Sequence, residues 1–327
     1  MTEIETAKAL VAQHLNGLDH AAPGAELTAH FARTHAPDHT YRGMRPFYDL
    51  SGAEAVAETV WSPFKAAATT LQRRPDMVIA SRDALSADAP VWVANMGHLL
   101  ADMTGDWLGI PAQNRTIFLP YATLHRVDGA QIIETVEFLD ILSLLTQAGR
   151  NPYAPHQTGA HLMAPGPKTH DGLGPHAEQN TEDTHRLTLA MLTDLATSYT
   201  SPAGHMTRFW HADMNWFGPA GIGSSLGFPG YRRGHTGPFE DKLDTQDILD
   251  WELSIAEGNF SAVMWWPCLR MTNTGGYMGV PASEALAEMR VIDLYRRDGD
   301  KLAENWIFID MLHFLAAQGV DLLETAP

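Results

Sequence analysis

Two aspartates, Asp140 and Asp310, combine a reactive side chain with apolar surroundings. Each follows a short apolar segment and precedes an apolar helical pattern. Alternation along a strand puts Asp140 on one face with Val136 and Phe138. A carboxylate among such groups is partly desolvated, which raises its pKa and suits general acid/base catalysis. Aspartate is also a preferred helix N-cap, so a structural interpretation of both residues stands beside the catalytic one.

His125 is the candidate partner of Asp140. It precedes the turn sequence Asp128-Gly129 on the adjacent strand, and we expect cross-strand pairing to bring it beside Asp140. A His–Asp pair moves protons near neutral pH. The second half of the chain has Tyr295 in place of the histidine, with Asp293 two residues earlier on the same face. The alternative for a histidine in a strand is a surface or core position.

Aromatic side chains are candidates for the lining of a pocket. Trp216, Trp265 and Trp306 all lie in the second half and could enclose a flat or hydrophobic ligand. The alternative is that they belong to the core. The predicted substrate-binding residues are Tyr41, His98, Trp107, Trp216, Trp265, Asp293, Tyr295 and Trp306.

The candidates correspond in pairs because the chain repeats itself. Gly109-Ile110-Pro111-Ala112 is followed 170 residues later by Gly279-Val280-Pro281-Ala282, and the match continues without a gap to the two aspartates. A second register, offset by 175, relates Pro63-Phe64 to Pro238-Phe239. Two copies of one unit imply two copies of one pocket.

Each copy begins with helices and continues with strands. Thr2 and Glu5 form a capping-box pattern before the first helix. Short apolar segments bounded by turns predict the strands. These strands are residues 77–81, 91–100, 115–126 and 131–139 in the first copy, and 248–256, 261–271, 289–296 and 301–309 in the second.

This order predicts an α+β fold of two tandem cone-shaped units, each with helices packed on a strongly curved antiparallel sheet. We expect the first unit at residues 1–150 and the second at 181–327. Between them, residues 151–180 are rich in Pro, Gly and His and predict a linker.

Composition narrows the classes of function. The 327 residues carry a formal net charge of −17, which argues against binding a phosphate backbone. One cysteine, Cys268, excludes an intrachain disulfide framework. The absence of a signal-peptide pattern and of a long apolar run predicts a cytoplasmic protein that does not bind membranes. The histidine spacings match no metal motif, so no metal is expected.

The chain resembles the SnoaL-like polyketide cyclases of the nuclear-transport-factor-2-like superfamily, in tandem duplication. The resemblance is carried by the Gly-Ile-Pro-Ala sequence, by the hairpin sequence before Gly129, and by Glu134 and Glu304 six residues before the aspartates. The second copy has Glu304-Asn305-Trp306 near the family's Glu-His-Trp, and the first copy departs from it.

The resemblance implies an enzyme without a cofactor that closes a ring on a hydrophobic carbonyl substrate by an aldol-type step. Asp140 and Asp310 would be its acid/base residues, with His125 assisting. It also implies pairing of units through their sheets, hence an internal pseudo-dimer, with a homodimer left open. The alternatives are a small-molecule hydrolase or isomerase that uses the same aspartates, and a non-catalytic ligand-binding or scaffold protein.

Overall fold

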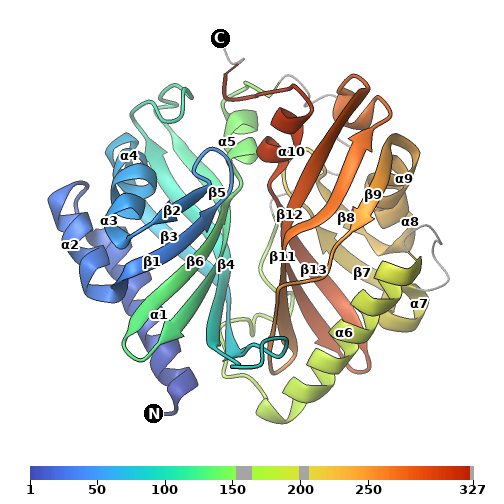
Figure 1. Ribbon diagram of the computed structural model, residues 1–327, viewed down its shortest axis with the longest axis horizontal. Helices are drawn as coiled ribbons and strands as arrows, with labels where there is room; N and C mark the ends of the chain where they lie inside the picture. Colours follow the sequence, from blue (N-terminus) through green and yellow to red (C-terminus); the bar gives the residue numbers. More distant parts are fainter. Residues whose placement is uncertain (152–163, 199–205, 325–327) are drawn as a thin grey trace. The chain divides into compact units, whose positions relative to one another are not determined.

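The computed structural model describes residues 1–151, 164–198 and 206–324, which form two compact units (Figure 1). Unit 1 comprises the chain up to Arg150 and the C-terminal residues from Leu322, and unit 2 comprises Asn151–Asp321. Of the expected linker, residues 152–163 lie outside the described part. The part from residue 164 packs within unit 2, where the Trp306 indole donates a hydrogen bond of 2.7 Å to the Pro165 carbonyl.

Unit 1 has a six-stranded sheet with most of its helices over one face (Figure 1). The sheet order is β2-β1-β6-β5-β4-β3, antiparallel except where β1 runs parallel to β6. The helices are α1 (Glu3–His20), α2 (Ala25–Thr34), α3 (Ala53–Val56), the π-helix η1 (Ala57–Trp61), α4 (Ser62–Ala67) and α5 (Ile141–Gln147). The strands are β1 (His35–Gly43), β2 (Asp49–Ser51), β3 (Ala68–Arg82), β4 (Val91–Met103), β5 (Thr116–Asp128) and β6 (Gln131–Leu139).

Unit 2 repeats this arrangement with the path β10-β11-β12-β13-β7-β8 and with β9 also paired to β11. Its helices are the short 3₁₀-helix η3 (Glu178–Asn180), α6 (Thr181–Ser198), α7 (Met206–Phe209), α8 (Gly227–Tyr231), the π-helix η4 (Arg232–Thr236), α9 (Gly237–Lys242), the 3₁₀-helix η5 (Tyr277–Gly279) and α10 (Met311–Ala317). Its strands are β7 (Trp210–Phe217), β8 (Ser224–Leu226), β9 (Leu243–Ile248), β10 (Leu253–Glu257), β11 (Phe260–Asn273), β12 (Ser283–Asp298) and β13 (Lys301–Ile309).

The predicted α+β fold with two separate sheets is confirmed, and so is the internal repeat. Asp293 pairs with Ile307 across β12 and β13, as Thr123 pairs with Glu137 across β5 and β6. All four residues are related by the offset of 170. The capping box at Thr2 is also present.

Two strands differ from the prediction. The segment predicted as one strand over 248–256 is divided, because β9 ends at Ile248 and β10 begins at Leu253. The strand predicted at 77–81 extends back to Ala68. Pro75 is tolerated inside it because β3 is an edge strand and its register shifts beside this residue.

Candidate functional site

Unit 2 contains a cavity of about 200 Å³ between the inner face of its sheet and its helices. Most of its wall is aromatic or aliphatic. The sheet contributes residues that alternate along β12 and β13, because side chains at every second position share one face. These sheet residues are Met289, Val291, Asp293, Tyr295, Asn305, Ile307 and Ile309, and the helices add residues that include Met191, Tyr231, His235 and Phe239.

Asp293 is the carboxylate that the sheet presents to this cavity. Its side chain is buried, and the Asn305 amide donates a hydrogen bond of 2.8 Å to Oδ1. The same amide also donates to the Leu294 carbonyl at 3.0 Å, which fixes its orientation. Burial raises the pKa of Asp293 to about 7, although hydrogen bonds from Asn305 and Tyr295 oppose the shift. The group therefore exists in both protonation states near neutral pH.

The helical wall adds two polar rings, those of His235 and Tyr231, to the lining of the cavity. His235 stacks on Trp216, with ring centroids 4.2 Å apart and planes inclined by 16°. Burial lowers the pKa of His235 to about 3, so this imidazole is neutral at pH 7. Tyr231 lies one turn earlier, and its pKa is raised by burial and by the charge of Asp293.

The corresponding space of unit 1 is almost filled. Its cavity measures about 10 Å³, which is near the lower limit for one water molecule. The residues around it include four histidines, His14, His35, His39 and His125, called here the histidine cluster. Such a space holds no organic substrate in this conformation.

Arg73 is one inward-facing residue that differs between the two units. It pairs with Leu99 of β4, as Ile248 pairs with Leu269 of β11, so the two residues hold the same place in their units. The guanidinium of Arg73 lies over the Tyr121 ring at 4.7 Å and forms an ion pair of 2.9 Å with Asp19. Ile248 instead lines the unit 2 cavity and is 44% exposed, which places it at the mouth.

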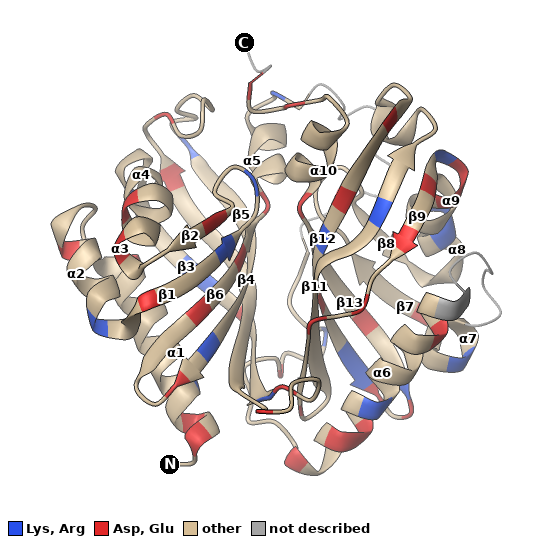
Figure 2. Ribbon diagram, in the orientation of Figure 1, with Lys and Arg blue, Asp and Glu red and all other residues tan. Residues whose placement is uncertain are grey.

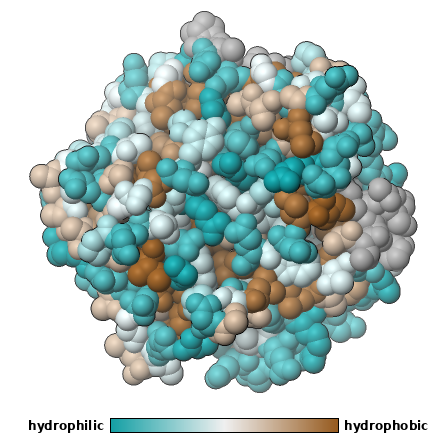
Figure 3. Space-filling view, viewed as in Figure 1, coloured by the Kyte–Doolittle hydropathy of each residue, from teal (hydrophilic) through white to brown (hydrophobic). Residues whose placement is uncertain are grey.

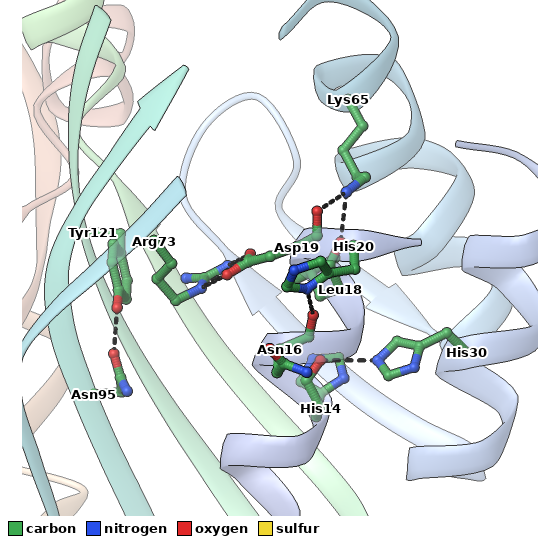
Figure 4. A network of polar contacts seen from close by, with 10 residues as sticks. All are labelled: His14, Asn16, Leu18, Asp19, His20, His30, Lys65, Arg73, Asn95 and Tyr121. Carbon is green, nitrogen blue, oxygen red and sulfur yellow. Dashed lines mark hydrogen bonds and ion pairs between the residues drawn. The ribbon is translucent and has the colours of Figure 1, made fainter. Parts of the chain in front are cut away.

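Figure 4 shows the contacts of Arg73 and Lys65 with the C-terminal end of α1. Arg73 reaches Asp19 near the end of that helix, and Lys65 donates hydrogen bonds to the carbonyls of Leu18 and Asp19 at 2.6 and 2.8 Å. A lysine at a helix C-terminus satisfies carbonyls that have no partner within the helix. The helix end is thereby fixed over the interior of unit 1.

Unit 1 nevertheless contains a buried carboxyl group of its own. Burial raises the pKa of Glu137 to about 7, and the Tyr41 hydroxyl donates to it at 2.9 Å. Glu137 lies directly across from Thr123, whose counterpart in unit 2 is Asp293. The two units therefore place one acid at the same location in the fold, but from neighbouring strands.

The histidine cluster is neutral at physiological pH. Burial lowers the pKa of His125 to about 3 and that of His39 to about 4. The pKa values of His14 and His35 also fall well below the usual value, first through burial and then through neighbouring histidines. Nδ1 of His125 and Nε2 of His39 each lie 3.0 to 3.1 Å from the Thr135 hydroxyl.

Asp140 and Asp310 both occupy N-cap positions. The carboxylate of Asp140 accepts from the Ser143 amide at 3.0 Å, and that of Asp310 accepts from the His313 amide at 3.0 Å. Neither aspartate is among the residues that line the two cavities. The geometry is thus that of the capping alternative.

His125 does not meet Asp140. It pairs with Thr135, five residues before Asp140 on β6, which corresponds to about 16 Å along a strand. The hairpin turn explains the separation, because residues close to the turn lie far from the other end of the strand. His125 contributes instead to the small cavity of unit 1.

The predicted substrate-binding residues divide into three groups. Trp216, Trp265, Asp293 and Tyr295 line the large cavity, and Tyr41 lines the small one. Three others line neither. Trp306 lies on the opposite face of β13, fully buried against Phe217, because even-numbered residues of this strand point away from the cavity.

The other two are His98 and Trp107. Nδ1 of His98 lies 3.0 Å from a carboxylate oxygen of Asp76. Trp107 packs against Phe47 and Phe64 in the core of unit 1.

Sequence reasoning missed Glu137, Asn305, Tyr231 and His235. A usable signal was present in the repeat itself. Aligned pairs on the odd-numbered face of the last two strands change their chemistry between copies, as Thr123 and Asp293 do, whereas the aspartates shared by both copies cap helices.

Two other kinds of site, a metal centre and a membrane-spanning helix, are not found among the described residues. Among them, no group of three or more His, Cys, Asp or Glu residues is arranged to hold a metal ion. No helix within the described ranges is long and apolar enough to cross a membrane. Figure 2 shows Lys and Arg scattered among acidic residues rather than gathered in a stripe, and the apolar patches on the face in Figure 3 are small and separate.

Comparisons with solved structures find proteins about half the length of this chain. A proposed SnoaL-like polyketide cyclase from Jannaschia sp. CCS1 is 18% identical, with a TM-score of 0.34, and covers 46% of this chain and 98% of its own. IdmH, a proposed polyketide cyclase from Streptomyces antibioticus, is 16% identical over 43% of this chain and 96% of its own, with a TM-score of 0.35. AclR, a proposed hydroxylase from Streptomyces galilaeus, is 16% identical over 46% and 100%, with a TM-score of 0.37.

Proteins named as SnoaL-like polyketide cyclases are thus among the structures that this chain resembles, as the sequence predicted. No protein-family model and no curated protein matches the sequence.

Proposed function

We propose that unit 2 is an acid/base enzyme that binds a hydrophobic carbonyl compound and moves a proton at the carbon next to the carbonyl group. The proposal rests on one observation: a cavity of about 200 Å³ with mainly apolar walls contains the buried carboxyl group of Asp293, whose pKa is raised to about 7. A base with a pKa near the working pH combines a useful ionised fraction with a strong tendency to accept a proton.

In the proposed step, the Asp293 carboxylate takes the proton from the α-carbon. The electrons of the broken C–H bond move to the carbonyl oxygen and form an enolate. In a ring closure, the enolate carbon attacks a second carbonyl of the same molecule, and the new alkoxide takes its proton from Asp293. The step returns the enzyme to its starting state and uses only groups of the protein and the substrate.

Asn305 supports this role by position. Its amide is held by the Leu294 carbonyl and donates to Oδ1 of Asp293, which fixes the carboxylate among the residues that line the cavity. A fixed base loses little entropy on reaching the reactive geometry. Tyr295, on the same face, adds a hydroxyl group to the polar end of the pocket.

For unit 1 we favour a supporting role without catalysis. Its cavity of about 10 Å³ and the Arg73–Asp19 ion pair leave no space for an organic substrate. A ligand-binding protein without catalytic activity remains the alternative for the whole chain, and proton exchange separates the two.

The test uses 2-acetylnaphthalene, a flat neutral ketone with acidic methyl protons, dissolved in D₂O with the full-length chain. We expect the wild-type protein to accelerate deuterium uptake into the methyl group, as followed by NMR. The Asp293→Asn variant should lose this activity, and Glu137→Gln in unit 1 should keep it. Binding of the ketone without accelerated exchange in the wild-type protein favours the non-catalytic alternative. A 1,5-diketone, followed by NMR for the cyclic product, then tests whether exchange leads to ring closure.

A further inference from the structure

The helical wall of the unit 2 cavity carries a histidine that has no equivalent in unit 1. His235 lies in the π-helix η4, between α8 and α9. Unit 1 has the same succession of helices, with the π-helix η1 between α3 and α4, and there the residue 175 positions earlier is Val60. The π-helix is therefore common to both units, whereas the imidazole is present in unit 2 alone at this position.

The ring is held in one orientation by aromatic neighbours. It stacks on Trp216 and also contacts Tyr231 and Phe239, with centroids 5.2 and 5.5 Å from its own. Such packing restricts rotation of the imidazole. A polar group fixed in this way, with its ring among the residues that line the cavity, is preorganised to meet a ligand.

The surroundings of Nδ1 indicate which nitrogen carries the proton. Nδ1 is buried and has no hydrogen-bond partner among the described residues. A proton on Nδ1 would bury an N–H group without an acceptor, which is costly. The tautomer protonated at Nε2 leaves at Nδ1 only an unpaired acceptor, and it keeps an N–H donor on a ring that lines the cavity. The low pKa of His235 keeps the ring neutral at pH 7.

We propose that the neutral imidazole of His235 donates a hydrogen bond to the carbonyl oxygen of a flat aryl ketone bound in the unit 2 cavity, opposite Asp293. The inference rests on the function proposed above, and it adds the ligand class and the group that holds the ligand's oxygen. Asp293 belongs to the sheet wall and His235 to the helical wall. A ketone between them presents its α-carbon to the base and its oxygen to the donor.

The walls favour a flat and uncharged ligand. Trp216, Trp251 and Trp265 are rigid aromatic surfaces, and the last two meet edge to face with centroids 6.2 Å apart. Among the lining residues, Arg232 is the one lysine or arginine, and its guanidinium is 3.5 Å from Glu240. An anionic ligand would therefore lack a free counter-ion and would be repelled by Asp293.

The chemical consequence concerns the enolate. As Asp293 removes the α-proton, negative charge moves to the carbonyl oxygen, which already accepts the proposed hydrogen bond from the Nε2–H group of His235. The proton of His235 stays on nitrogen throughout, and the hydrogen bond strengthens as the charge develops. Loss of one such donor in a dry site costs about 10²-fold in rate.

The test measures the carbonyl stretch of 2-acetylnaphthalene labelled with ¹³C at the carbonyl, bound to the full-length protein. The wild-type complex should show the band at lower wavenumber than the same ketone in hexane. His235→Phe keeps an aromatic ring of similar shape and should lose the shift, together with about 10²-fold in the exchange rate. His235→Gln keeps a donor and should retain part of both. The affinity for naphthalene, which has no carbonyl, should be the same in wild type and His235→Phe.

The possible contrary results distinguish failure of the role proposed for His235 from failure of the proposed enzyme activity. An unshifted band in the wild-type complex, or a shift and exchange rate that survive in His235→Phe, overturns the assignment of His235 while Asp293-dependent exchange still stands. A shifted band that requires His235, without exchange in the wild-type protein, supports the donor and overturns the proposed enzyme. Equal losses of affinity for naphthalene and for the ketone in His235→Phe would assign the ring to packing. Failure of the wild-type protein to bind either compound overturns both proposals.

Discussion

Units 1 and 2 share their strand register, their π-helix and their capped last helix, yet their interiors differ in kind. In unit 1 the histidine cluster surrounds a cavity of about 10 Å³, and Arg73 packs on the Tyr121 ring nearby in the same interior. Unit 2 has Ile248 and Val291 at the places of Arg73 and Tyr121, and a cavity of about 200 Å³. A few inward-facing side chains therefore decide whether this fold encloses a ligand site or a packed core.

The two units also differ in the strand that supplies their buried carboxyl group. Glu137 and Asp293 reach one location from adjacent strands, and burial raises the pKa of each to about 7. Only Asp293 faces a cavity large enough for a substrate. A raised pKa alone therefore does not mark a catalytic group, and access to a ligand has to accompany it.

The largest expected effect separates these two acids. Asp293→Asn should lower the rate of deuterium exchange by about 10³-fold, because an amide cannot accept the α-proton. Glu137→Gln, the matched change in unit 1, should leave the rate within about twofold. A rate loss in Glu137→Gln comparable to that in Asp293→Asn, with both proteins folded by circular dichroism, would make unit 1 part of the active site.

Acidification should destabilise unit 1 more than unit 2. A buried histidine whose folded pKa is near 4 stays neutral while the unfolded chain binds a proton below about 6.5. Its contribution to stability is therefore lost as pH falls below 6.5, by about 2 kcal/mol at pH 5 for one such ring. The cluster has four rings whose pKa values are lowered by burial, and they are opposed by one acid, Glu137, whose raised pKa acts in the other direction. In unit 2 the effects of His235 and Asp293 roughly cancel.

Hydrogen–deuterium exchange mass spectrometry at pH 7.5 and pH 5, corrected for the intrinsic rate, measures both units in one chain. Peptides from β5 and β6 should lose protection at pH 5, and those from β12 and β13 should keep it. Equal loss in both units would contradict the role given to the histidine cluster.

The third prediction places the arginine of unit 1, Arg73, at the equivalent position in unit 2, Ile248. Ile248→Arg should place a guanidinium at the mouth of the large cavity and weaken binding of 2-acetylnaphthalene by about tenfold, or about 1.4 kcal/mol. Ile248→Met, similar in volume and apolar, serves as the control and should bind like the wild-type protein. Titration calorimetry measures both, and unchanged affinity in Ile248→Arg would mean that this position does not control access.

The smallest effect is expected at the two helix caps. Asp140→Ala and Asp310→Ala should each reduce the free energy of unfolding by about 1 kcal/mol, because each removes a carboxylate that accepts from the first turn of a helix. Asp→Asn at either position keeps a capping side chain and should preserve both stability and the exchange rate. Loss of exchange in Asp310→Asn, with the melting temperature unchanged, would restore the acid/base role considered for this residue.

Much of the fold could be predicted from the sequence. The offsets of 170 and 175, the capping box at Thr2, and the turns at Gly129 and Gly299 are local patterns, and local patterns determine element type and order. The site was harder to predict. Trp216 and Trp265 were predicted as aromatic residues, and Asp293 and Tyr295 by their place beside the aligned histidine position, whereas Asn305 and His235 were missed although they also differ from their counterparts in unit 1, Thr135 and Val60.

The sequence alone determined that two copies of one α+β unit follow each other, because hydrophobic periodicity, turns and repetition are properties of neighbouring residues. Tertiary structure decided which carboxyl group meets a cavity. It did so because burial, and the pKa that follows from it, depend on side chains brought together from separate elements. Arg73 in unit 1 and Ile248 in unit 2 hold the same strand position, and the different interiors around them depend on strand register and packing.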